Sequence, residues 1–549
     1  MELQRDIRAL ALPLVALLAA LLLAAMVPRP TQASLRDPEL PVPELTVDGH
    51  VAHRLKVYVP PGFTVHYTLD GSLPDARSPQ ANGHIAAEPD PRRTSRLLRQ
   101  PSSIQWRHPV GDFPSGTVVR ACACDREGLC GPVVTRTLGI DAQRDGLPVF
   151  SLALPEGALF DPDSGIYTIG HGIMRTNEPA VARFPRDQRW WKYPGNYQFR
   201  GRRWERSAHL TMIADKGLGI WKGDVRVRIH GNNTRGFAQH ALRVYMPKER
   251  KDDVGLDLPR TLLLRTGGND QDKAFMRDAV VHEACRELGL WHTDAWPVVV
   301  YLNGAYWGIH EKRERLDNER MAHGFRVKPK PKHIAILADR ALPWRADSVE
   351  AKRFLWRLAR IERAAQSAGV ADTAAQWIDV EQFLTYMASQ MIVGNTDWPD
   401  QNVKYWRYTG PEPEAGTARD GRWRFILGDC DVALGYATGP DVDVLEQVMT
   451  KQGPVARLFR AVMADPVARE RFHRTITELL AGDLSPVRIV ALIDRHAAEL
   501  EPAMPMHIRR WRRPASMEAW HTEVERMRDF ARQRPPFVKE QLDRHLPLR

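Results

Sequence analysis

The chain has 549 residues, which is longer than one ordinary domain and suggests about three. Its apolar fraction of 43% and charged fraction of 26% are those of a folded globular protein, which excludes a largely disordered chain. The formal charge is 78 − 67 = +11, but the basic residues are spread along the whole chain without a recognition-helix or aromatic RNA-binding motif. We therefore expect no nucleic acid among the partners.

The first feature along the chain is an uncharged apolar run, Ala9–Val27, which is just long enough to span a bilayer as a helix. Arg5 and Arg8 precede this run, so the positive-inside rule puts the N-terminus in the cytoplasm and the rest of the chain outside. A cleaved signal peptide that ends at Ala33 is the alternative, and it would give a secreted protein. Because the run is longer than a usual signal core, residues 1–33 predict a retained cell-membrane anchor.

A linker and a small β domain are expected next. Residues 34–45 are rich in proline and predict an extended linker. Short alternating segments between turn residues over 46–140 predict a β-sandwich. Within it "YTLDGS", Tyr67–Ser72, and Pro74 resemble the signature of the chitobiase C-terminal-type, immunoglobulin-like domains. The resemblance implies a spacer or packing module of an envelope enzyme, which we prefer to sugar binding because no cluster of exposed aromatic residues accompanies it.

Three of the five cysteines, Cys122, Cys124 and Cys130, lie close together near the end of this predicted sandwich. Cys122 and Cys124 point to the same face of a strand, so either of them could face Cys130 across a hairpin. One disulfide is expected in an oxidising compartment, whereas a zinc site would need a fourth ligand that this stretch does not offer. Cys285 and Cys430 are expected to be buried thiols.

The remaining residues, 147–549, predict an α+β domain whose parts follow one another in a definite order. Strands come first, in "VFSLAL", "VRVRIHG", "ALRVYM" and "TLLLRTGG". A helix over Lys273–Leu290 follows, and then two strands joined by Asn303-Gly304, a preferred hairpin turn. Residues 347–393 are expected to be largely helical, "VKYWRYTG" and "GRWRFILGDCD" to form a second hairpin, and roughly the last hundred residues to be helical again.

Acidic and amide residues stand where the helix before the second hairpin ends and where that hairpin ends. Asp397 and, five positions later, Asn402 follow the run "FLTYMASQMIV", while Asp429 and Asp431 follow the strand "RFIL". Phosphoryl transfer needs a carboxylate near the attacking hydroxyl and hard oxygen ligands for Mg²⁺. Asp397 is placed for the first task, and Asn402 and Asp429 for the second, with Asp431 able to assist. One such aspartate alone would more often form a turn, but the set in this order favours a site.

Six segments in the correct order are similar to successive motifs of the CotH-type (spore coat protein H) kinases. They include "RIHGNNTRGFAQHALRVYM", "LLLRTGGNDQDKAFMRDAVVHEACRELGL", "GNTDWPDQN" and "FILGDCDVALGYA", and the resemblance runs from about Leu147 to the C-terminus. It implies an atypical protein-kinase-like domain of two lobes that uses ATP with Mg²⁺ or Mn²⁺ and acts on exported or surface proteins. It also implies that Asp397 is the catalytic aspartate and that Asn402 and Asp429 hold the metal.

Further residues are carried over from the same motifs. Arg228 and Arg243 are candidates for binding the ATP phosphates, since a guanidinium offers a fork of donors, and Gly231 would let the backbone approach a ligand closely. Glu314 matches a glutamate of the family's "Y-W-G … E" motif, with a structural ion pair as an equal alternative. Four more charged residues either tie helix to sheet or touch substrate: Arg265, Asp270, Arg277 and Asp278.

Two positions depart from the family pattern. Members commonly carry a lysine three residues ahead of the arginine of "ALRVYM", where this chain has His240. If that lysine anchors ATP, activity is in doubt, because a largely neutral histidine binds phosphate poorly near pH 7; Arg243 is the candidate to compensate. Gly428 stands before Asp429 where an aromatic residue is usual, a change expected to cost only packing.

These observations favour a membrane-anchored kinase that transfers the γ-phosphate of ATP to Ser or Thr hydroxyls of exported or envelope proteins, outside the cytoplasm. The alternative is a catalytically inert envelope scaffold, which His240 supports and the intact set of Asp397, Asn402 and Asp429 opposes. A carbohydrate-active enzyme ranks last, because no pair of carboxylates can be chosen by its spacing.

Overall fold

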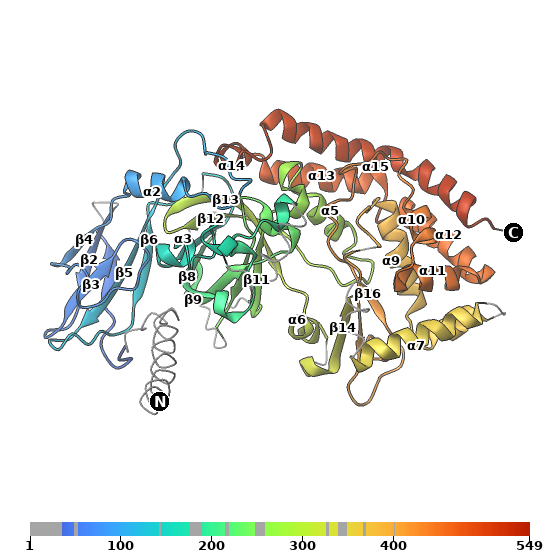
Figure 1. The fold of residues 1–549 in the computed structure, drawn as a ribbon, viewed down its shortest axis with the longest axis horizontal. Coiled ribbons are helices and arrows are strands. Elements are labelled where there is room, and N and C mark those ends of the chain that lie inside the picture. The colour runs from blue at the N-terminus through green and yellow to red at the C-terminus, as the bar shows by residue number, and fades with distance from the viewer. Residues whose placement is uncertain are drawn as a thin grey trace, which may run out of the picture. The chain divides into compact units, whose positions relative to one another are not determined.

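The computed structural model describes residues 36–48, 53–141, 144–174, 189–214, 219–247, 258–325, 329–338, 348–365, 369–399 and 401–548. These residues fall into two compact units (Figure 1). The first unit takes its residues from the part of the chain up to Glu88 and from Thr117–Gly139. The second holds Pro89–Gly116 and the described residues from Ile140 onward, so part of the segment expected as β-sandwich belongs to the second unit.

The first unit contains two small antiparallel sheets that share one apolar core, in the manner of the expected β-sandwich. The strand orders are β1-β2-β4 and β3-β5-β6. Its described strands are β1 (Glu44–Val47), β2 (Arg54–Tyr58), β3 (Thr64–Thr68), β4 (His84–Ala86), β5 (Thr117–Cys124) and β6 (Val134–Leu138). The core takes Leu55 and Ile85 from one sheet and Val65 and Val119 from the other, since alternate side chains of a strand point to the same face.

A disulfide joins Cys124 to Cys130, which decides between the two pairings that the sequence left open. Cys122 keeps a free, buried thiol, and burial raises its pKa. Cys285 and Cys430 are free and buried as predicted.

Seven described strands of the second unit close into a barrel in the order β10-β11-β13-β12-β7-β8-β9. All neighbouring pairs given for these strands are antiparallel except β12 with β7. The barrel strands are β7 (Val149–Ala153), β8 (Arg206–Ile213), β9 (Gly219–Ile229), β10 (Leu242–Tyr245), β11 (Thr261–Arg265), β12 (Trp296–Leu302) and β13 (Ala305–Glu314). The predicted hairpin at Asn303-Gly304 connects β12 to β13, and both turn residues have positive φ.

Alternation along β9, β10 and β11 separates an apolar face from a basic face. Val227, Val244 and Leu264 are buried in the apolar core that the barrel strands share. The residues between them point outward, and the register pairs Arg228 of β9 directly with Arg243 of β10. The outer face of these strands is therefore where the predicted phosphate-binding arginines lie.

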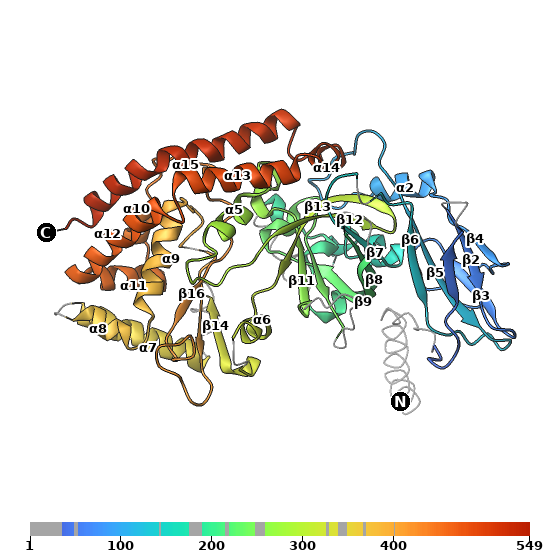
Figure 2. The ribbon, with the colours of Figure 1, turned by 180° about the vertical axis from the view of Figure 1, so that it is seen from behind.

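Helices and a second, three-stranded sheet complete the second unit. The sheet has the order β14-β15-β16, with β14 (Ile334–Ala338), β15 (Lys404–Tyr408) and β16 (Arg424–Ile426). The longer described helices are α2 (Pro91–Leu98), α5 (Arg277–Ala284), α7 (Val349–Ala364), α9 (Val380–Ile392), α11 (Pro454–Met463), α12 (Pro466–Ala481), α13 (Pro486–Leu500), α14 (Met504–Trp511) and α15 (Met517–His545). The shorter ones are α3 (Glu156–Phe160), α6 (Asn318–His323), α8 (Val370–Ala375) and α10 (Val444–Thr450). Helices α13 and α15, in red, lie side by side in both views (Figures 1 and 2).

Helix α5 is shorter than predicted. The sequence predicts a helix over Lys273–Leu290, whereas α5 covers Arg277–Ala284. Phe275 has a φ of 68°, which a right-handed helix does not allow, and the Asp270 carboxylate accepts hydrogen bonds from the amides of Ala274 and Arg277. These contacts make residues 273–276 a turn that leads into the helix.

Among the residues that the structure describes, no helix is both long enough and apolar enough to cross a membrane. The predicted anchor, Ala9–Val27, lies outside them.

Candidate functional site

Asp397 and Asn402 lie in one tight loop after α9 and contact each other directly. The Asn402 Nδ2 donates to Asp397 Oδ2 at 3.0 Å, and the Gln401 Nε2 donates to Asp397 Oδ1 at 2.8 Å. Asn402 has a φ of 63°, and asparagine is one of the few residues that tolerate this conformation. Trp398, between the two, is buried and donates through Nε1 to the Tyr386 hydroxyl at 2.9 Å. The loop therefore holds the half-buried Asp397 carboxylate between two amides.

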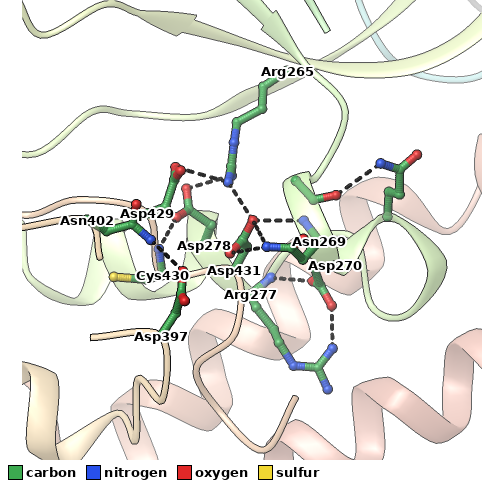
Figure 3. A network of polar contacts seen from close by, with 12 residues as sticks. Arg265, Asn269, Asp270, Arg277, Asp278, Asp397, Asn402, Asp429, Cys430 and Asp431 are labelled. Atoms are coloured by element: carbon green, nitrogen blue, oxygen red, sulfur yellow. Dashed lines mark hydrogen bonds and ion pairs between the residues drawn. The ribbon is translucent and has the colours of Figure 1, made fainter. Parts of the chain in front are cut away.

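Asp429 follows β16 and lies next to this loop. Gly428 is the reason for the close approach, because a Cβ at this position would be 2.1 Å from the Asn402 carbonyl oxygen. Asn395, which follows α9, donates to the Asp429 carbonyl oxygen at 3.2 Å. The sequence predicted that this departure from the family pattern costs only packing, and the contact that the structure shows at Gly428 is this steric one with Asn402. Figure 3 shows Asp397, Asn402 and Asp429 together.

Arg265, at the end of β11, reaches both acidic residues that follow β16. Its Nη2 lies 3.1 Å from Asp429 Oδ1 and 3.1 Å from Asp431 Oδ2. Figure 3 shows Arg265 with these two aspartates. Its Nη1 lies 2.9 Å from Asp278 Oδ2 on α5. Burial alone would lower the pKa of Arg265, but the surrounding carboxylates raise it well above its usual value. Arg265 thus joins the barrel, α5 and the segment 429–431, which we call the acidic loop.

Side chains of helix α5 bind the backbone of the acidic loop and of Gly428 before it. The Cys430 amide donates to Asp278 Oδ1 at 2.5 Å, and the His282 Nε2 donates to the Gly428 carbonyl at 3.0 Å. Burial would raise the pKa of Asp278, but Arg265 and Arg313 lower it below its usual value. Asp278 is therefore a charged anchor for the segment that carries Asp429.

Asp431 is almost fully buried and accepts hydrogen bonds from the loop after β11. The Asn269 amide donates to its Oδ2 at 2.8 Å, and the Asn269 Nδ2 lies 3.3 Å from Oδ1. A Cβ on Gly268 would meet Asp431 Oδ2 at 2.0 Å, so only glycine fits there. Burial and the carboxylates of Asp429 and Asp278 raise the pKa of Asp431 to about 7, against the opposite effect of Arg265. Its side chain is 3% exposed, compared with 57% for Asp429.

Asp270 and Arg277 connect the loop after β11 to α5 and α15. Arg277 is fully buried, pairs with Asp270 and donates to Glu523 Oε2 of α15 at 2.7 Å. Of the two roles that the sequence left open for this pair, the contacts are those of a structural tie.

Arg228 and Arg243 lie side by side on the outer face of the barrel with little acidic compensation. Arg243 Nη2 lies 2.9 Å from His230 Nδ1, and its Nε is buried without a hydrogen-bond partner among the described residues. Burial, Arg243 and other arginines push the pKa of His230 well below its usual value, so this imidazole is a neutral acceptor. Arg228 reaches Glu205 only at 3.8 Å, and Glu205 pairs more closely with Arg226 at 2.5 Å.

Arg200 joins this group from the segment before β8. Burial, Arg228 and Arg243 lower the pKa of Arg200, which is the effect of adjacent like charges. Arg235 fixes that segment, since its guanidinium donates to the carbonyls of Tyr197 and Phe199 at 2.7 and 3.1 Å. The close contact that Gly231 permits lies within its own loop, because a Cβ at this position would be 2.4 Å from Thr234 Oγ1.

His240 does not lie on the outer face of the barrel that carries Arg228 and Arg243, which we call the arginine face. It is fully buried between Tyr167 and Tyr197, with ring centroids 4.5 and 4.8 Å away, and its Nε2 donates to the Ser102 carbonyl at 3.0 Å. Burial lowers its pKa to about 3. The doubt that His240 raised about phosphate binding is therefore misplaced, because this side chain points into the core.

Glu314, the last residue of β13, has an ion-pair partner of its own. It lies on the opposite face of β13 from Arg313 and pairs with Arg320 of α6. With Trp291 and Arg320 it lines a cavity of about 240 Å³. The structure thus brings Asp397, Asn402, Asp429 and Asp431 together, places Arg228 and Arg243 on the sheet that carries Arg265, and leaves Glu314 in an ion pair.

The family model described as CotH kinase protein matches residues 227–538, which is more than half of the chain. The chain belongs to the CotH kinase family. A comparison with curated proteins gave no match.

The oxygens of this CotH site fit a hard divalent cation. Because the Asn402 Nδ2 donates to Asp397, the amide oxygen of Asn402 is left for a metal. Asp429 offers an exposed carboxylate. Asp431 is committed to Asn269 and Arg265. A second cluster, Asp278, His282 and Cys430, is close enough to ligate. Both its imidazole nitrogens are already used, Nε2 by Gly428 and Nδ1 by the Thr293 amide, so it is not a metal site.

Several residues around the CotH site were not predicted from the sequence. Arg200, Asn269 and Arg313 contact or adjoin the predicted residues, yet each lies in a different segment. Asn269 carried a signal, because it follows Gly267-Gly268 at the end of a strand, where a glycine pair marks a close approach.

Proposed function

We propose that the protein is an ATP-dependent protein kinase of the CotH family. The observation that carries this proposal is the packing of the Asp397–Asn402 loop against Gly428 and Asp429, which places a held carboxylate beside amide and carboxylate oxygens. Phosphoryl transfer depends mostly on positioning and on neutralising charge, and these residue types serve both needs. Asp397 is the proposed catalytic residue, and Asn402 and Asp429 are the proposed metal ligands.

The proposed step is transfer of the γ-phosphoryl group to a Ser or Thr hydroxyl. Asp397, oriented by the amides of Gln401 and Asn402, accepts the hydroxyl proton. The oxygen–phosphorus bond forms while the bond to the β-phosphate oxygen breaks, and ADP leaves. Mg²⁺ or Mn²⁺, when bound, neutralises charge on the phosphates. Asp431 contributes by holding the loop of Asn269 against the acidic segment.

The arginine face supports the proposed binding of the ATP phosphates by Arg228 and Arg243. Within the described residues, neither Arg200 nor Arg243 has a carboxylate within 4.0 Å, so their charges are available to an anion. Guanidinium groups match phosphate oxygens well. Glu314 keeps a proposed place near the nucleotide only through its family motif.

The order of elements supports a two-lobed, kinase-like arrangement. Helix α5 lies between β11 and β12, and its Asp278 pairs with Arg265 of β11. In protein kinases a helix of this place pairs its carboxylate with a strand cation, and an acidic residue after a later strand binds the metal. Asp429 has the corresponding position after β16.

The proposed setting is the outer side of the cell membrane, with Ala9–Val27 as the anchor and the β-sandwich, of chitobiase type, as a spacer. The substrate would then be an exported or envelope protein. The inert-scaffold alternative took its support from His240, and the burial of that side chain in the core removes this argument.

The test is phosphoryl transfer by the full chain in detergent. Labelled ATP with Mg²⁺ or Mn²⁺ should give incorporation by the unmutated protein and by Arg471→Ala, whose partner Glu381 is exposed. Incorporation should fall by about 10²-fold or more in Asp397→Asn and Asp429→Asn. Equal labelling by all four proteins would reject the assigned roles, and an absence of nucleotide binding would favour the scaffold.

A further inference from the structure

The carboxylates around Arg265 outnumber the cations that they contact. Four acids belong to this linked cluster: Asp278, Glu311, Asp429 and Asp431. Within the described residues two cations face them, Arg265 and Arg313, so the formal balance with all four carboxylates ionised is 2 − 4 = −2. His282 also packs against Asp278, but burial lowers its pKa to about 4, so it adds no charge near pH 7. One divalent cation would neutralise the cluster.

Arg265 occupies the side of Asp429 and Asp431 on which such a cation would gain most. Its Nη2 lies 3.1 Å from an oxygen of each carboxylate. Nη1 is held by Asp278 at 2.9 Å, and the side chain is only 11% exposed, so the guanidinium is fixed from behind. Figure 3 shows it pointing at the acidic loop from the barrel side. A free metal ion near Asp429 would therefore lie close to a positive charge that cannot move far.

A metal that arrives with a nucleotide meets a different balance. Its charge is already offset by the phosphates, so Arg265 repels the complex much less than it repels the bare ion. The phosphates are in turn attracted to the outer face of the barrel, where Arg228 and Arg243 lie. The exposed Asp429 carboxylate can turn from Arg265 to the metal, whereas the buried Asp431 stays with Arg265 and Asn269.

We propose that Arg265 is an internal cation that neutralises Asp429 and Asp431 when no nucleotide is present, so that a divalent metal binds strongly only together with the nucleotide phosphates. Arg265 is in this view a positioning residue that acts through the two aspartates. The proposal rests on the proposed function insofar as Asp429 is a metal ligand.

The test measures Mn²⁺ binding to the full chain in detergent, by the paramagnetic resonance of free Mn²⁺, without and with ATP. Mn²⁺ alone should bind the unmutated protein weakly, and Arg265→Gln should bind it at least about tenfold more tightly, because one positive charge near the ion is gone. The gain should disappear in Arg265→Gln/Asp429→Asn. Arg265→Lys keeps the charge, but its single ammonium group can approach either Asp278 or the pair Asp429 and Asp431, not both. Its affinity for Mn²⁺ should lie between those of the unmutated protein and Arg265→Gln. Arg471→Gln is the matched surface control.

Two results would overturn the proposal. One is Mn²⁺ binding by Arg265→Gln that equals or falls below that of the unmutated protein, since a purely structural arginine predicts loss. The other is binding of Mn²⁺ alone to the unmutated protein as tight as with ATP; this comparison needs no variant and decides even if Arg265→Gln does not fold. Failure of the proposed function looks different: ATP would bind to none of the proteins, while the effect of Arg265→Gln on Mn²⁺ alone would persist.

Discussion

Replacing Arg277 by methionine should destabilise the second unit without removing any group from the proposed site. Arg277 is fully buried and pairs with Asp270, which is also fully buried, and with Glu523 of α15. Methionine fills a similar volume but leaves the Asp270 carboxylate without its counter-charge. Breaking a buried pair by removing one partner costs about 3–5 kcal/mol. A large domain loses about 2–4 °C in Tm for each kcal/mol, so the midpoint should fall by roughly 10 °C.

The pH dependence of this loss gives a sharper test than its size. Burial already raises the pKa of Asp270 despite the opposing effect of Arg277, and removal of Arg277 should raise it further. The folded variant then binds a proton that the unfolded chain has released, so its stability falls as pH rises from the unfolded pKa through the folded one. The deficit against the unmutated protein should be smallest near pH 5 and largest near pH 8.

Thermal unfolding followed by circular dichroism at several pH values measures both effects. Arg471→Ala is the control, because its ion pair with Glu381 is half exposed and such pairs contribute less than about 1 kcal/mol. A loss for Arg277→Met no larger than that of the control, or a deficit that does not change with pH, would refute the assignment of Arg277 and Asp270 as a buried structural pair.

Three further variants test single features. Gly268→Ala should cost at least about 2 kcal/mol, because φ is +67° and the new Cβ would strike Asp431; an unchanged denaturation midpoint would contradict this loop geometry. His240→Lys should lower Tm by burying an ammonium group and should not improve ATP binding by calorimetry, so tighter binding would show that position 240 reaches the phosphates. Removing the Cys124–Cys130 disulfide by double alanine substitution should cost about 2 kcal/mol for a separation of six, measured in urea, and equal midpoints would argue against the bond in solution.

Local patterns predicted the elements that depend on nearby residues. The hairpin at Asn303-Gly304 follows from its turn residues, and β15 with β16 follows from alternation on both sides of a polar loop. The strand β14 was not predicted, because a short run such as "IAILA" has no clear period. Its partner β15 is also distant in sequence, since the described helices α7, α8 and α9 lie between the two strands. The start of α5 was missed because Asp270, seven residues before Arg277, decides it through side-chain bonds.

The interpretation of His240 shows where motif comparison and physical reasoning diverge. Two residues three positions apart in extended chain point to opposite faces, so His240 and Arg243 could not both face the same phosphates. Leu242 and Val244 are buried in the barrel core, which places His240 with them and Arg243 outside. The expectation that Arg243 compensates for a side chain at 240 therefore conflicts with strand alternation, an argument that was available from the sequence.

The site itself depends on contacts that no local pattern contains. Arg265 meets Asp429 and Asp431 across more than 160 positions of sequence, and Asp278 meets the Cys430 amide across 152. In sequence these residues are separate strand-end and helix-start charges, each with an ordinary structural explanation. Their chemistry comes from convergence, because four carboxylates close together, three of them buried and that of Asp429 exposed, are stable only with cations between them. The described residues supply two of these as arginines, and the remaining formal negative charge is the physical reason to propose a divalent metal ion at this site.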